Sequence, residues 1–98
     1  MKISFEFSGG MELLFGNEKM LTVDVPVKDG SELTLGEVMA WARDNILTER
    51  PEMFMKGNTV RPGVLVLVND ADWELSGLDE SPLADGDRVA FISTLHGG

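Results

Sequence analysis

The chain has 98 residues, of which 43% are hydrophobic and 26% are charged, a composition that predicts one globular domain with its own core. It contains no cysteine, which excludes disulfide bonds, thiolate-ligated zinc, iron–sulfur clusters and a cysteine nucleophile. Eight basic residues against seventeen acidic ones give a formal charge of −9, which argues against direct binding to nucleic acid or to an anionic membrane.

The hydropathy pattern favours neither a membrane protein nor a secreted one. The longest apolar run, Val64 to Val68, is far too short to cross a bilayer. The N-terminus alternates between polar and apolar residues, unlike the continuous apolar stretch of a signal peptide. Together with the absence of cysteine, these features predict an intracellular, cytoplasmic protein.

The first third of the chain predicts a β-hairpin. Apolar residues alternate with polar ones near the N-terminus, as in a half-buried strand, at Ile3, Phe5 and Phe7. A second alternating strand is expected over Met20–Val27, and turn residues between the two strands are supplied by Gly9-Gly10 and Gly16-Asn17. The intervening segment Met11–Phe15 can extend either strand, and the pattern does not decide which.

A helix is expected next. Thr34 and Glu37 match a capping box, in which both side chains satisfy free backbone N–H groups at the start of a helix. Five apolar residues then follow with helical spacing and form one stripe: Leu35, Val38, Met39, Ala42 and Ile46. Trp41 lies on the flank of that stripe, and Arg50-Pro51 should close the helical region.

Two further strands are expected in the second half. Val64–Val68 is apolar at every position, which is typical of an interior strand covered on both faces. The last strand, from Arg88 to about Thr94, also carries apolar residues on both faces and should be central. Between them, Met53–Gly63 is expected to be irregular, Trp73–Leu75 a possible short strand, and Asp85–Asp87 a tight turn.

The order of these elements predicts an α+β domain. A small mixed sheet with one main helix packed across it is the compact arrangement of a hairpin, a helix and two buried strands. We expect this grasp-like domain to occupy residues 1–93 and to be followed by a flexible tail, residues 94–98.

The tail, Thr94-Leu95-His96-Gly97-Gly98, is the feature that this fold does not explain. Two terminal glycines can be a disordered chain end. They can also pass through a channel too narrow for side chains and bring the terminal carboxylate to a partner's active site. That carboxylate, with an ordinary pKa of about 3.5, is ionised at pH 7. It must therefore be activated, most simply as an acyl-adenylate made from ATP, before it can carry a group.

Catalytic and metal-binding alternatives are weaker. His96 is the only histidine, and the sequence offers it no partner for a catalytic triad or a metal site. Asp70, Asp72 and Glu74 alternate like the start of a calcium-binding loop, but Leu75 stands where the loop requires glycine. We therefore interpret the three acidic residues as a solvated turn.

Four blocks of the sequence resemble the eukaryotic ubiquitin-related modifiers that act as sulfur carriers. In chain order they are Phe7–Phe15, Val60–Val68, Asn69–Leu75 and Phe91–Gly98. The likeness spans nearly the whole chain, although Ser81-Pro82 stands where many members have an aromatic residue. The resemblance implies a ubiquitin-like β-grasp fold.

The resemblance also implies a chemistry for the tail. An activating enzyme, which uses ATP, would adenylate Gly98 and convert it to a thiocarboxylate. A separate complex would pass the sulfur to the wobble uridine of certain tRNAs, and the activated terminus could also form isopeptide bonds with lysines of target proteins. Residues Thr94, Leu95, His96 and Gly97 would serve tail recognition by the activating enzyme. The protein would be a monomeric carrier with no bound cofactor, not an enzyme.

Two other functions stay open on the sequence. One is a ubiquitin-fold module that binds partners noncovalently and whose Gly-Gly end is incidental. The other is a sulfur carrier for molybdopterin or thiamine synthesis, which uses the same chemistry toward a different acceptor.

Overall fold

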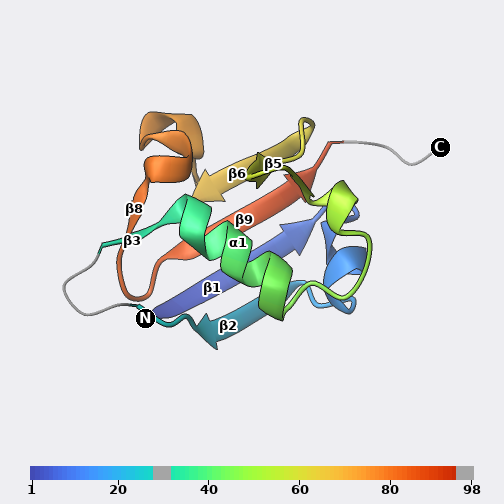
Figure 1. Cartoon of the computed structure of the whole chain (residues 1–98), viewed down its shortest axis with the longest axis horizontal. Coiled ribbons are helices and arrows are strands. Elements are labelled where there is room, and N and C mark those ends of the chain that lie inside the picture. The colour runs from blue at the N-terminus through green and yellow to red at the C-terminus, as the bar shows by residue number, and fades with distance from the viewer. Residues whose placement is uncertain (28–31, 95–98) are drawn as a thin grey trace.

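A five-stranded mixed sheet with one helix across it forms the body of the molecule in a computed structural model, which describes residues 1–27 and 32–94 (Figure 1). The sheet order is β2 (Met20–Asp24), β1 (Lys2–Ser8), β9 (Arg88–Ser93), β6 (Val64–Val68), β7 (Ala71–Asp72). Strands β1 and β9 are parallel, and the other neighbours are antiparallel. The expected sheet-and-helix architecture is confirmed.

Helix α1 (Leu35–Asn45) begins where the capping box predicts. The Glu37 backbone N–H donates to the Thr34 hydroxyl, and the Thr34 N–H donates to the Glu37 carboxylate. Four residues of the predicted apolar stripe are buried against the sheet: Leu35, Val38, Met39 and Ala42. Just before the helix, β3 (Leu33–Thr34) pairs with β8 (Pro82–Leu83) and holds its start in place.

Phenylalanine side chains form the centre of the core between the sheet and the helix. The inward face of β1 supplies Phe5 and Phe7, whose rings stack with Phe91 of β9. Phe15 stacks on Phe7 with ring centroids 4.0 Å apart, and Phe54 packs edge-on against both Phe15 and Phe91. All five rings are buried, so Phe91 anchors the core face of β9 in this aromatic cluster.

The predicted hairpin of β1 and β2 is confirmed, but the connection between the two strands and the end of β2 differ from the prediction. The segment Met11–Phe15 extends neither strand and forms a 3₁₀ helix, η1, between Gly10 and Gly16, both in left-handed conformations. This turn buries Met11, Leu14 and Phe15, which strand alternation would have placed on opposite faces. Strand β2 ends at Asp24, opposite Lys2, where β1 begins.

The segment expected to be irregular contains a small hairpin. After the short 3₁₀ helix η2 (Pro51–Met53), strand β4 (Met55–Lys56) pairs with β5 (Thr59–Val60). Its glycine and asparagine form the turn of this hairpin. Phe54 and Met55 are buried.

The prediction of a central β9 is confirmed, whereas β6 is covered less completely than its sequence suggested. Leu65 is 37% exposed because α1 covers only one face of the sheet. Trp73–Leu75 is not a strand but a 3₁₀ helix, η3, which starts with the Asp72 carboxylate accepting from the Glu74 N–H. A second short 3₁₀ helix, η4 (Leu78–Glu80), follows it. The turn at Asp85-Gly86 is confirmed.

Candidate functional site

The C-terminal tail leaves the body at the end of the central strand. Ser93 pairs with Val64 of β6, and the Thr94 backbone N–H donates to the Gly63 carbonyl at 2.8 Å. The Thr94 hydroxyl donates to the same carbonyl. Thr94, the first residue predicted to recognise the activating enzyme, is thus joined to the body by two hydrogen bonds. Leu95, His96, Gly97 and Gly98 lie outside the described residues, and their roles stay predictions.

We call Ser93 and Thr94, the last described residues before the tail, the tail root. On the other side of β9, the turn that follows β1 comes close to the tail root at Ser93. Gly9 has a φ of +67°, and a Cβ placed there would lie 2.3 Å from the Ser93 carbonyl oxygen. Only glycine fits this approach without a backbone shift. The sequence indicated a turn at Gly9-Gly10 but gave no sign that this turn fixes the exit of the tail.

A cleft of about 360 Å³ opens beside the tail root. Its apolar wall comes from η1 and η2, and its residues include Gly9, Met11, Leu13, Arg50, Met53 and Ser93. Sequence reasoning did not find this cleft, because it joins three segments that are far apart along the chain. The helical spacing of Met11, Leu14 and Phe15 could have indicated the cleft wall, but only if Met11–Phe15 had been recognised as a helical turn.

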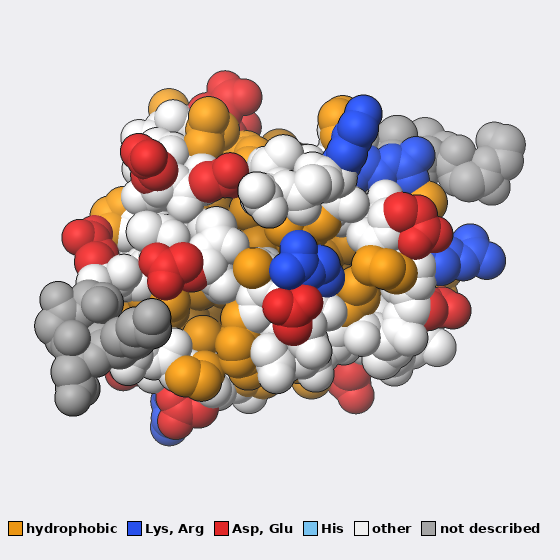
Figure 2. All heavy atoms as spheres, viewed as in Figure 1, with side chains coloured by type: hydrophobic (Ala, Val, Ile, Leu, Met, Phe, Trp, Pro, Cys, Tyr) orange, Lys and Arg blue, Asp and Glu red, His pale blue; other side chains and the backbone are white. Residues whose placement is uncertain are grey.

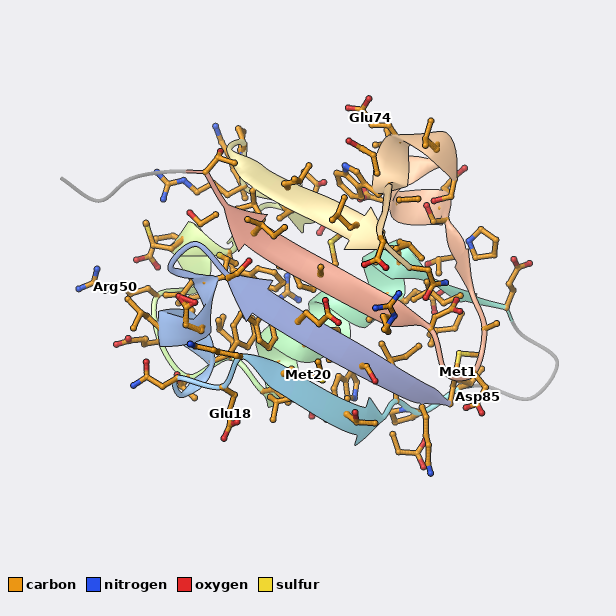
Figure 3. All side chains as sticks on the ribbon, turned by 180° about the vertical axis from the view of Figure 1, so that it is seen from behind. Met1, Glu18, Met20, Arg50, Glu74 and Asp85 are labelled. Carbon is orange, nitrogen blue, oxygen red and sulfur yellow. The ribbon has the colours of Figure 1, made fainter. Side chains whose placement is uncertain are left out.

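Two arginines at this end of the molecule make no ion pair within the described residues. The Arg61 guanidinium donates to the Met53 thioether sulfur, and Arg50 lies across η2 from it with a left-handed backbone. Figure 3 shows Arg50 pointing away from the body at this end, and basic side chains gather here in Figure 2. Glu49 lines the same cleft as Arg50, and Glu52 lies in η2, so this end of the molecule carries charges of both signs.

The sheet face opposite α1, which Figure 3 shows from the front, carries a shallow hollow that extends along β9 from Ala90 to Ile92. Ala90 and Ile92 of β9 pair with Leu67 and Leu65 of β6 across this face. Ala90, Ile92 and Leu67 line the hollow together with Met20, which is 58% exposed, and Glu6, Lys19 and Asp70 border it. An exposed apolar surface next to the exit of the tail is suited to contact a protein that must handle the tail.

The three acidic residues that alternate like a calcium loop serve separate local roles. Asp70 pairs with Arg88 at 2.6 Å, and Asp72 caps η3. Glu74 is exposed at the molecular surface. Within residues 1–27 and 32–94, no group of three or more metal-ligating side chains could hold an ion, and no helix is long and apolar enough to span a membrane.

The comparison with known families covers almost the whole chain. The model of the family described as Urm1 (ubiquitin related modifier) matches residues 2–98. A ubiquitin-related modifier 1 homolog of Chlamydomonas reinhardtii is 65% identical over 98 residues, covering 100% of this chain and 99% of the relative. A homolog of Arabidopsis thaliana is 54% identical over 101 residues and is covered completely, as is this chain.

Structural comparison agrees. The solution structure of Urm1 from Trypanosoma brucei superimposes with a TM-score of 0.82 at 43% sequence identity, covering 99% of this chain and 95% of that one. The ubiquitin-like β-grasp fold expected from the sequence is therefore confirmed.

Proposed function

Because the chain belongs to the ubiquitin-related modifier family, we propose that it is a sulfur carrier whose terminal glycine, Gly98, is activated and converted to a thiocarboxylate. The observation that carries this proposal is the extent of the family match, which runs to residue 98 and includes the Gly97-Gly98 end. The chain has no cysteine that could hold sulfur as a persulfide. The C-terminal carboxylate is the group left to carry it.

The chemistry follows from the ionised carboxylate. Its oxygen attacks the α-phosphorus of ATP on the activating enzyme, and pyrophosphate leaves to give the acyl-adenylate. The terminal sulfur of an enzyme persulfide then attacks the acyl carbon and displaces AMP. A thiol of the enzyme reduces the resulting acyl disulfide, which releases the thiocarboxylate and leaves a disulfide on the enzyme. The chain itself supplies the carrier group and its presentation, and it binds no cofactor.

The body supports this role by presenting the tail from a fixed point. Strand β9 is held by β1 and β6, and the hydrogen bonds of Thr94 to Gly63 extend that support to the edge of the tail. The cleft that Arg50 and Ser93 line and the hollow that reaches Ile92 both adjoin this point. We propose that the activating enzyme approaches here, since its active site must enclose Gly98, and that Thr94 to Gly97 thread the tail into it.

In the proposed pathway, the sulfur passes to a thiolation complex that modifies the wobble uridine of tRNA in the cytoplasm. Conjugation is a second outcome of the same activation, and the family's description as a modifier favours it. In that reaction the ε-amine of a target lysine attacks the acyl carbon of the Gly98 adenylate, displaces AMP and forms an isopeptide bond. The chain would act as a monomer in both reactions and would contact tRNA only through the thiolation complex.

Mass spectrometry of the C-terminal tryptic peptide tests this proposal. Cleavage after Arg88 releases Val89–Gly98, which contains no methionine, so methionine oxidation cannot be confused with replacement of oxygen by sulfur. We expect a thiocarboxylate on this peptide, resolved by exact mass, when the protein is isolated from its own cells with thiol protection.

A chain that lacks Gly98 is the matched control and should give only the free carboxylate. If the full chain also gives only free carboxylate when activating enzyme and ATP are supplied, the carrier function is wrong. A noncovalent binding module would then be favoured, and it should tolerate a protein fused after Gly98.

A further inference from the structure

The two short 3₁₀ helices η3 and η4 form a cap, residues 73–80, at the end of the molecule away from the tail. The cap follows β6 through β7, and β6 runs antiparallel to β9, so it lies beside the Arg88 end of β9 (Figure 1). The tail leaves from the Ser93 end of the same strand, about 17 Å away at about 3.3 Å per residue. A partner can therefore contact the cap without enclosing the tail.

The cap exposes two leucines. Leu75 is 82% exposed and Leu78 is 45% exposed, and Leu75 is the most exposed of the large hydrophobic side chains in the described part of the chain. Leu78 also has a φ of +57°, a left-handed conformation that a branched side chain rarely adopts. Neither leucine contributes to the core, which is complete without them.

Hydrogen bonds from a buried serine hold the leucines in this outward arrangement. Ser81 is fully buried, and its hydroxyl donates to the Leu78 carbonyl at 2.7 Å. It accepts a second hydrogen bond from the Ser76 hydroxyl at 2.8 Å, and the Ser76 backbone N–H donates to the Trp73 carbonyl. The cap is thus ordered by internal hydrogen bonds while its two leucines face solvent.

The surface around the leucines is acidic. The chain from Asn69 to Asp87 contains seven carboxylates and no lysine or arginine: Asp70, Asp72, Glu74, Asp79, Glu80, Asp85 and Asp87. Glu74 and Glu80 are exposed and make no ion pair with the described residues. Acidic side chains cover this end in Figure 2, and Glu74 points outward from the cap in Figure 3.

We propose that the cap docks on the tRNA-thiolating enzyme that accepts the sulfur, an inference that rests on the proposed function. The leucines fit an apolar socket, and the carboxylates require lysine and arginine around it. An enzyme that holds tRNA must carry such basic surface, because it neutralises phosphates. The activating enzyme engages the opposite end, so the two partners recognise the carrier through different surfaces.

Charge reversal at the cap tests the electrostatic part. The chain is loaded as thiocarboxylate, and sulfur transfer to tRNA by the thiolating enzyme is measured against carrier concentration. We expect E74K/E80K to raise KM about tenfold at low salt, with the effect shrinking as salt is added. The matched control E18K/E52K makes the same change in net charge on exposed residues elsewhere and should change KM less than about twofold.

Replacing the exposed Leu75 tests the apolar part of the docking proposal. Leu75→Ser should raise KM about fivefold with kcat unchanged, because a docking contact is lost while the chemistry is retained. Since Leu75 lies outside the core, folding should be preserved, and circular dichroism checks this. Adenylation of Gly98 by the activating enzyme should proceed at the wild-type rate in every cap variant.

The outcomes separate the two proposals. If the loaded wild-type chain transfers no sulfur to tRNA, the proposed function fails and the docking proposal fails with it. If the wild type transfers sulfur but the cap variants have its KM, the docking proposal alone is overturned. Equal effects of E74K/E80K and E18K/E52K, or an equal loss of adenylation, would also overturn it.

Discussion

The two ends of strand β9 are held by different forces. At its first residue, Arg88 pairs with Asp70 at 2.6 Å and with Glu6 at 3.7 Å, in the acidic half of the molecule. At its last residue and just beyond, close backbone contacts with Gly9 and Gly63 position the chain, and the nearby Arg50 and Arg61 have no ion pair in the described structure. The comparison shows that one strand joins an end held by ion pairs to an end held by backbone contacts, and the two proposals above assign a different partner to each end.

The largest expected effect is at the tail. Deleting Gly98 should abolish thiocarboxylate formation and conjugation, because the acyl group and the threading length are both lost. The described core lies within residues 3–91, so the melting temperature should stay at the wild-type value. Thermal unfolding and the mass of the tryptic peptide measure the two effects. A fall in melting temperature comparable to that of a core variant would contradict this separation of tail from body.

The next effect is expected at the tail root. Gly9→Ala should cost about 3 kcal/mol of unfolding free energy, because the added Cβ combines left-handed strain with a backbone clash at Ser93. It should also slow adenylation, since the clash displaces the strand from which the tail leaves. Urea unfolding gives the first quantity and pyrophosphate release gives the second.

Gly57→Ala is the matched control for Gly9→Ala. Gly57 has nearly the same φ, +66°, but a Cβ there would meet nothing within 4 Å. It should therefore cost only about 1 kcal/mol, from the left-handed conformation alone. Equal costs for the two variants would show that the approach of Gly9 to Ser93 does not constrain the tail root.

A smaller effect is expected at the opposite end. Ser81→Ala should lower the unfolding free energy by about 1 kcal/mol, because it removes the buried hydroxyl that bonds Leu78 and Ser76. Amide exchange should increase within residues 73–80 and stay unchanged at the tail root. Ser4→Ala, which removes a solvent-accessible hydrogen bond to Thr22, is the control. Uniform exchange across the chain would mean that the cap is not an independent unit.

Sequence periodicity predicted the elements that face one core. The alternation of β1, the capping box at Thr34 and the apolar stripe of α1 each match the structure, because one buried face imposes one period on each element. It failed at two short helical turns. Met11–Phe15 is a 3₁₀ helix flanked by two left-handed glycines, and Trp73–Leu75 is a 3₁₀ helix capped by an aspartate. A helix of three to five residues is too short to show a hydrophobic period in the sequence.

The candidate site also combines features that are local in the sequence with contacts between distant segments. The role proposed for the Gly98 carboxylate rests on the sequence alone and stays a prediction, because its chemistry is local to the terminus. The approach of Gly9 to Ser93, the cleft next to η1 and the arginines beside Met53 join segments distant in the chain. Such contacts depend on topology, and a pattern of neighbouring residues does not encode them directly.

The smallest expected effect concerns acid stability at the N-terminal end of β1. The Met1 amine donates to the Asp24 carboxylate at 2.8 Å, and this hydrogen bond, with the charge of the amine, lowers the pKa of Asp24 below its usual value. A carboxyl with a lowered pKa in the folded state adds stability above its unfolded pKa of about 4, and this stability is lost as pH falls toward the folded pKa. Asp24→Asn should therefore lower the melting temperature slightly at pH 7 and bring it level with the wild type at pH 2. Acetylating the amine of the wild-type chain should reproduce this profile, and a difference that persists at pH 2 would show that Asp24 acts through packing rather than through its charge.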